Sequence, residues 1–297
     1  MKRDCKLLTA VFLLLANLTT PALALGEFDR HFEIGKDFFD RQQYKLAVPE
    51  FSAAITAAKE NAKLKAKALV ERGTAYSELT KYDLALKDLG DAIALNPSSA
   101  LAFNNRGVVY LRADKPDLAK SDFDRALSIE PGNRYALVNR AGSLLTMKGK
   151  VDVSPTLKWL EQEKWPADFS GNTANFSCHA VVLTLLTLQK SKDKAAFNSL
   201  LDTALTKLNR LYWPYPMLQH FKGKLSAEEV LEKAQESTYS LTQAEAFLGL
   251  ESLFAGQKDE AAKRFDFVSN HGTINSVEYW LVKHFQSQLK EPAKKSK

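Results

Sequence analysis

The sequence predicts an all-α protein, a solenoid of stacked helical hairpins. Two observations support this prediction. The segment 72–97 recurs 34 residues later at 106–131, with glycine, tyrosine, alanine and proline in register. Apolar residues follow helical spacing almost throughout, and no alternating run is long enough for a sheet. A fixed period of this length is typical of a repeat array.

The N-terminus predicts a cleaved signal peptide, residues 1–24. Basic residues precede the apolar run 7–18, and small residues follow at Ala22 and Ala24. An uncleaved anchor is the alternative, although the run is shorter than the ~20 residues of a spanning helix. No cysteine stands near the cleavage site to carry a lipid. We therefore expect a periplasmic or secreted chain with no integral membrane span after cleavage.

Charge and cysteine content exclude several classes of partner and stabilisation. The net charge of +6 falls to +4 without residues 1–24, and much of the remainder lies in the basic C-terminal tail. A nearly neutral body predicts no nucleic-acid partner and no basic membrane-binding face. The mature chain would keep only Cys178, so it cannot form an internal disulfide.

The recurring unit has a defined set of small, aromatic and proline positions. A Gly-x-x-Tyr group is followed nine residues later by alanine and, after a further 12, by proline, which is the pattern of the tetratricopeptide repeat. The small residues permit the two helices of a hairpin to cross, the tyrosine fills the layer between hairpins, and the proline follows the second helix. The two central units contain Gly73, Tyr76, Ala85 and Pro97, and Gly107, Tyr110, Ala119 and Pro131.

Further units extend the array in both directions. One unit lies around Gly35, before the two central units, and about one extra helical turn separates it from the next unit. A fourth starts at Leu137 and decays, and the pattern returns near the C-terminus with Gly249 and Ala261. The expected organisation is a signal peptide (1–24), an array of three clear repeats and one degenerate repeat (28–160), an irregular helical segment (161–240), a C-terminal hairpin with a capping helix (241–290) and a basic tail (291–297).

Three C-terminal stretches carry a family resemblance: 211–234 with its Trp-Pro turn, 245–265, and the closing EYWLVKHF at 278–285. Together with the leader and the hairpins, they resemble the new lipoprotein I family of bacterial envelope proteins. The resemblance implies a homodimeric adaptor that presents peptidoglycan hydrolases to a C-terminal-processing protease. The sequence lacks the lipid-attachment cysteine of that family, so it predicts a chain without the outer-membrane anchor.

No constellation of residues predicts catalysis, a metal or a cofactor. Cys178 and His179 are adjacent, and adjacent side chains on a helix diverge, so they do not form a nucleophile and base pair. The five histidines lack the spacing of metal ligands on one helix. Two alternatives to an adaptor remain open: an envelope hydrolase with a site within 161–240, and a purely structural dimerisation module.

Recognition is the function that the repeats predict. The first helices of successive hairpins are expected to line a concave face that binds envelope proteins or peptides. Asn105 and Asn139 are 34 residues apart and could hydrogen-bond an extended peptide, although asparagine there is also common repeat consensus. The predicted partner-binding residues are Glu71, Thr74, Ser77, Glu78, Asn104, Asn105, Val108, Leu111, Arg112, Tyr135, Val138, Asn139 and Gly142.

Overall fold

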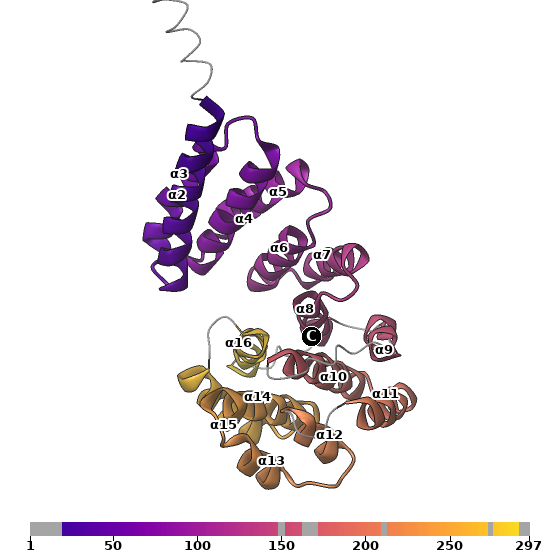
Figure 1. Ribbon diagram of the computed structural model, residues 1–297. Helices are drawn as coiled ribbons and strands as arrows, with labels where there is room; N and C mark the ends of the chain where they lie inside the picture. Colours follow the sequence, from indigo (N-terminus) through magenta and orange to yellow (C-terminus); the bar gives the residue numbers. More distant parts are fainter. Residues whose placement is uncertain (1–19, 148–151, 162–171, 209–212, 273–275, 291–297) are drawn as a thin grey trace, which may run out of the picture. The chain divides into compact units, whose positions relative to one another are not determined.

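A computed structural model confirms the all-α fold. It describes residues 20–147, 152–161, 172–208, 213–272 and 276–290. Within these residues there are fifteen helices and no strand (Figure 1). None of these helices combines the length and apolar character required to cross a membrane. Most of the predicted leader and the whole basic tail lie outside the described residues, and the expected cleavage site after Ala24 falls within the first described helix.

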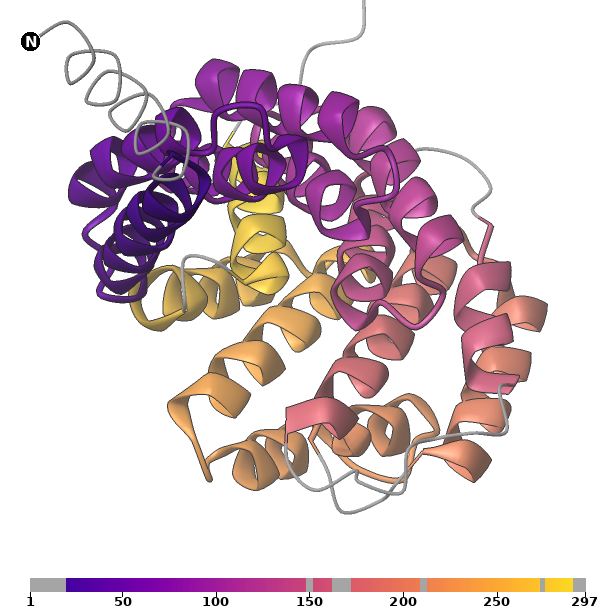
Figure 2. The same cartoon turned by 45° about the horizontal axis from the view of Figure 1, so that its top comes forward.

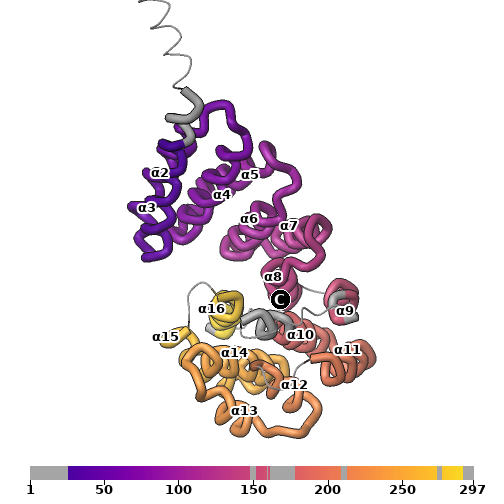
Figure 3. The backbone as a smooth tube through the Cα atoms, viewed as in Figure 1, coloured from indigo at the N-terminus to yellow at the C-terminus, as the bar shows by residue number. Residues whose placement is uncertain are grey.

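The chain divides into two compact units, residues 1–109 and 110–297, and the boundary lies within one helix. Unit 1 consists of antiparallel helices in chain order, as the tube in Figure 3 and the indigo to purple helices of Figure 2 show. Successive helices between residues 20 and 95 pack against one another. The helices are α2 (Thr20–Asp40), α3 (Tyr44–Ala57), α4 (Ala62–Glu78), α5 (Tyr82–Leu95) and the start of α6 (Ala100–Arg112).

Small residues stand where the helices of a hairpin cross in unit 1, as predicted. A Cβ atom on Gly35 of α2 would lie 2.7 Å from the ring of Phe51 on α3. On Gly73 of α4 it would lie 3.3 Å from the carbonyl oxygen of Ala85 on α5. Because these helices approach so closely, a larger side chain would force them apart. The extra residues after the first hairpin lengthen α4 at its beginning, so α4 has 17 residues where α6 has 13.

Where the structure describes it, unit 2 begins with the end of α6 and continues through ten more helices. The first are α7 (Pro116–Ile129), α8 (Arg134–Thr146), α9 (Ser154–Glu161) and α10 (Asn172–Lys190). The next are α11 (Lys194–Lys207), α12 (Tyr215–Phe221) and α13 (Ala227–Ala234). The last are α14 (Thr238–Phe254), α15 (Lys258–His271) and α16 (Val277–Lys290).

Helix α10 is the centre of unit 2 and explains the loss of repeat register after residue 161. Every residue from Cys178 to Leu188 is buried. The helix packs against α8 on one side and against α11 and α14 on others. A helix surrounded in this way must be apolar all round, whereas a repeat helix keeps a polar stripe.

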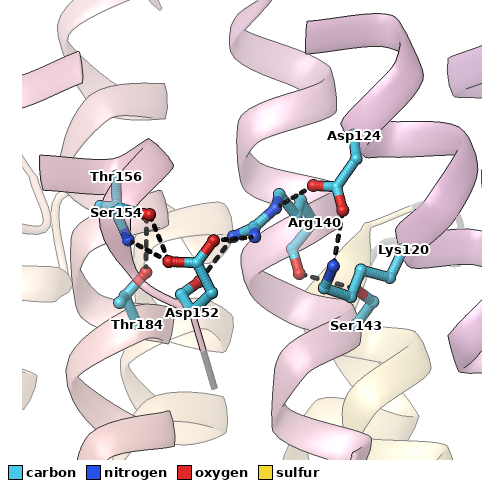
Figure 4. A network of polar contacts seen from close by, with 8 residues as sticks. All are labelled: Lys120, Asp124, Arg140, Ser143, Asp152, Ser154, Thr156 and Thr184. Carbon is cyan, nitrogen blue, oxygen red and sulfur yellow. Dashed lines mark hydrogen bonds and ion pairs between the residues drawn. The ribbon is translucent and has the colours of Figure 1, made fainter. Parts of the chain in front are cut away.

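In the degenerate fourth repeat, the arginine of the repeat pattern pairs with different partners (Figure 4). In the second repeat, Arg72 pairs with Asp88, 16 residues further on. Arg140 occupies the same repeat position, but the residue 16 further on is Thr156. Arg140, 1% exposed, donates instead from Nε to Asp124 Oδ1 of α7 at 2.5 Å, and from Nη1 to the carbonyl oxygen of Asp152 at 3.1 Å. The pair therefore joins α8 to the preceding hairpin and to the segment before α9.

The C-terminal hairpin, α14 and α15, restores the repeat geometry. A Cβ atom on Gly249 would lie 2.8 Å from the ring of Phe265, and Ala261 is fully buried. Arg264 Nη1 donates to Glu245 Oε2 at 2.7 Å, which links the two helices. Helix α13 begins with a capping box, in which Ser226 and Glu229 exchange hydrogen bonds. Helix α16 then packs against α15, α14 and α8.

Candidate protein-interaction surface

The predicted partner-binding residues of unit 1 lie on α4 and α6, the first helices of their hairpins. Glu71, Thr74 and Glu78 are partly exposed on α4, as are Asn105 and Val108 on α6. Two of the predicted residues are buried: Ser77 is 4% exposed and Asn104 is 7% exposed. The accessible part of this surface, which we call the unit 1 face, therefore consists of Glu71, Thr74, Glu78, Asn105 and Val108.

A chain of side-chain hydrogen bonds crosses the unit 1 face from α6 to α4. Asn104 Nδ2 donates to Asn105 Oδ1 at 3.2 Å, and Asn105 Nδ2 donates to Thr74 Oγ1 at 3.1 Å. The Thr74 hydroxyl in turn donates to the carbonyl oxygen of Val70 at 2.8 Å. Since each group is held by the next, Asn105 and Thr74 are oriented before any partner arrives.

Glu71 lies beside this chain among several charges. Burial raises the pKa of its carboxyl group, while the charges of Lys36 and Lys67 act to lower that pKa and the charge of Asp40 acts to raise it. The ammonium of Lys67 also lies 4.1 Å from the centre of the Phe32 ring, within range of a cation–π contact. Positive and negative groups thus alternate at this end of the unit 1 face.

Sequence reasoning missed Lys36, and the repeat period could have found it. The residue directly after each repeat glycine belongs to the predicted partner-binding set in the later repeats, as Thr74 and Val108 do. Lys36 follows Gly35 at the same offset and is exposed.

The predicted residues of unit 2 are more deeply covered. Tyr135 is 50% exposed and Asn139 is partly exposed, whereas Val138 is 6% exposed and Gly142 is buried. At the end of α6, Leu111 is 4% exposed and Arg112 is partly exposed. Asn105 lies in unit 1 and Asn139 in unit 2.

Comparison with known proteins places residues 70–134 in a family, because they match the tetratricopeptide repeat model. This match covers the same hairpins in which the glycine crossings and the Arg72 pair occur. The chain is a tetratricopeptide-repeat protein. No curated protein sequence matches it.

Several solved structures are similar to this chain. A tetratricopeptide repeat protein from Parabacteroides merdae is 18% identical, with a TM-score of 0.52 over 87% of this chain and 98% of the other. The second such domain of human RPAP3, solved with an HSP70 peptide, is 30% identical over 41% of this chain and 97% of the other, with a TM-score of 0.37. YrrB, described as having an unusual peptide-binding site, is 17% identical over 79% of this chain and 98% of the other, with a TM-score of 0.39.

Cys178 and His179, the residues considered for catalysis, are buried in this repeat protein. Cys178 is 2% exposed, and burial raises the pKa of its thiol to about 12, so a thiolate nucleophile is not available at neutral pH. His179 is also buried on α10, 3.9 Å from Glu278 of α16. In the part of the chain that the structure describes, no group of three or more histidine, cysteine or acidic side chains could hold a metal ion. The tetratricopeptide fold typically serves as a non-catalytic interaction scaffold.

Proposed function

We propose that this chain is a non-enzymatic adaptor of the bacterial envelope that binds partner proteins or peptides through the unit 1 face. One observation carries the proposal: the bonded chain of Asn104, Asn105 and Thr74 across α6 and α4. Amide and hydroxyl groups fixed on a rigid helical surface can hydrogen-bond a peptide backbone at a low cost in side-chain entropy.

The charge of the unit 1 face favours a partner of modest net charge. Lys36 and Lys67 surround Glu71, and no unbroken row of basic residues follows them on α4. Such a surface gives orientation through single polar contacts and does not depend on strong electrostatic attraction. Val108 adds an aliphatic contact beside Asn105.

The proposal also includes a location, the bacterial envelope, and a class of partner. The leader sequence at 1–24 supports export, and the resemblance to the new lipoprotein I family supports cell-wall hydrolases and a C-terminal-processing protease as partners, with a homodimer as the binding form. Export is tested by fractionating cells and measuring the intact mass. We expect an envelope protein that begins at Leu25, and a cytoplasmic full-length chain would contradict the location.

Binding is tested with a displayed library of random peptides panned against the immobilised full chain, followed by affinity measurement on the selected peptide. The variant Asn105→Ala combined with Thr74→Val removes the bonded side chains of the unit 1 face. The matched control is Lys87→Ala, which removes only an exposed lysine that pairs with Asp91 on α5.

We expect the double variant to weaken binding at least about tenfold, as the loss of about 1.4 kcal/mol or more would do, and the control to bind as the wild type. Both variants should retain the helical circular dichroism signal of the wild type. Equal affinity of the double variant and the wild type would rule out the unit 1 face as the binding surface.

A further inference from the structure

In unit 2, the face of α8 that the repeat pattern turns toward a partner is covered by α16 of the same chain (Figure 1). Gly142 stands at the repeat position of Val108, which is partly exposed in unit 1. A Cβ atom on Gly142 would clash with the side chain of Val277, and Leu281 is the other residue nearest to it at 3.8 Å. All of these nearest atoms belong to α16, whereas those near Gly73 belong to its own hairpin partner α5.

Helix α16 packs against three neighbours, α8, α14 and α15, and its Leu281 and Val282 are fully buried. Val277 and Leu281 are one turn apart, and His284 and Phe285 follow in the next turn on the same side. His284 Nδ1 lies 3.1 Å from Asp114 Oδ1 in the turn after α6, and Asp114 is exposed. Burial, with the charge of Lys190, lowers the pKa of His284 in spite of Asp114, so the contact is a hydrogen bond from a neutral imidazole. Phe285 lies beneath the ammonium of Lys190 of α10, 5.7 Å from its ring centre.

One buried acidic side chain of α16 has only long polar contacts. Glu278 is 4% exposed, and its Oε1 accepts from Gln243 Nε2 at 3.4 Å and lies 3.9 Å from His179 Nε2. The phenol of Tyr239 on α14 is a further titratable group near it. Burying a carboxylate is costly, and contacts as long as these recover only part of the cost. An apolar side chain at this position would hold the helix more firmly.

We propose that α16 is an autoinhibitory occupant of the α8 face, and that a partner presenting an amphipathic helix of the same pattern displaces it. The partner helix would carry an aliphatic residue opposite Gly142, a second one four residues later and a hydrogen-bond donor seven residues after the first, opposite Asp114. This inference concerns a different surface from the unit 1 face and does not depend on peptide binding there.

Competition between α16 and a partner helix should lower the apparent affinity for the partner by a measurable factor. A self-occupied face that is open in 0.1–10% of molecules binds an outside helix about 10- to 1000-fold more weakly than a face that is always open. Releasing α16 should therefore raise the apparent affinity for a helical ligand by that factor without any change on α8.

The test uses a labelled synthetic peptide with the sequence of residues 276–290 and the full chain in three forms. Val277→Asp removes the side chain that covers Gly142 and leaves α8 unchanged. Aspartate is also favourable in the first turn of a helix, so α16 should still form. The double variant Val277→Asp with Gly142→Val blocks the α8 face. Gly90→Val is the matched control for the added valine, because a Cβ atom there meets nothing within 4 Å.

We expect the Val277→Asp chain to bind the peptide 10- to 1000-fold more tightly than the wild type and the Gly90→Val control. The double variant should lose that gain. Hydrogen exchange of Val277→Asp should quicken in α16 while α10 and α14 stay protected.

Three results would overturn the proposal. The Val277→Asp chain could bind no better than the wild type, exchange could quicken in α10 and α14 together with α16, or Val277→Asp could fail to fold. The last two would make α16 an integral part of the core. If only Gly142→Val fails to fold, the comparison of Val277→Asp with the wild type decides. The unit 1 variants leave this readout unchanged, so its failure is distinct from failure of the proposed function.

Discussion

The guanidinium of Arg72 donates two hydrogen bonds to the carboxylate of Asp88, from Nε to Oδ2 at 2.7 Å and from Nη2 to Oδ1 at 2.8 Å. The pair joins the two helices of the second repeat, α4 and α5. Arg72 also donates from Nη1 to Ser52 Oγ of α3 at 3.0 Å, so it links neighbouring hairpins. The side chain of Asp88 is only 4% exposed.

Replacing Asp88 with alanine should destabilise unit 1 by about 1.5–3 kcal/mol, because Arg72 loses a charged partner that is shielded from water. The double variant Arg72→Met with Asp88→Leu should recover much of the loss, since an apolar pair of similar size avoids the unpaired charge. Urea denaturation followed by circular dichroism measures both changes. A single variant as stable as the wild type would show that the pair contributes nothing to the repeat.

Replacing two glycines with alanine should change the free energy of unfolding in opposite directions. Gly249→Ala would bring a methyl group to 2.8 Å from the ring of buried Phe265, so we expect a loss of about 1–3 kcal/mol. Gly90→Ala meets nothing within 4 Å and should gain about 0.5–1 kcal/mol, because alanine restricts the unfolded chain and favours helix. Thermal unfolding measures the two shifts. Equal effects at both positions would contradict the close approach of α14 and α15.

His220 should make the stability of unit 2 depend on pH. Its Nε2 lies 2.9 Å from Glu251 Oε2 and its Nδ1 lies 2.9 Å from the carbonyl oxygen of Leu225. The hydrogen bond with Glu251 is the main cause that raises the pKa of His220 above its usual 6.5. Since the folded state holds the proton more firmly, this contribution is complete below pH 6.5 and is lost as the pH rises through the raised pKa.

We therefore expect His220→Gln to be less stable than the wild type at pH 5.5, with a smaller difference at pH 8.5. Urea denaturation across this range measures the difference, with His271→Gln as the control because His271 is exposed on α15. A difference that does not vary with pH would contradict the ion pair with Glu251.

Glu71 should also make stability depend on pH, but through a carboxyl group whose neutral form the folded state favours. Burial raises the pKa of its carboxyl group above 4.5, so the folded state favours the protonated form and stability falls as the pH rises from 4.5 through the raised pKa. Glu71→Gln should be more stable than the wild type at pH 7, and the gain should shrink toward pH 4.5. Glu60→Gln, at an exposed position before α4, is the control in the same denaturation series. A loss of stability at pH 7 would show that Lys36 and Lys67 outweigh burial.

The repeat hairpins could be predicted from the amino-acid pattern, because their packing depends on contacts within about 16 residues. Gly73 and Ala85, or Gly249 and Phe265, belong to one hairpin, so a fixed spacing of small and large residues is sufficient to specify the crossing. The helical segments after residue 161 could also be predicted, since their apolar spacing is local. The partner-binding assignments stay predictions, and the structure narrows the accessible ones in unit 1 to a few side chains.

The helix that covers α8 could not be predicted from the amino-acid pattern. Gly142 and Val277 are far apart in the chain, and no period or spacing relates them. The repeat pattern at Gly142 predicts an exposed position that faces a partner. The apolar side of α16 is typical of any capping helix and does not indicate where the helix docks. The place where such a helix docks depends on which buried surfaces remain after α10 has filled the centre of unit 2, and that is settled by the packing of the whole unit.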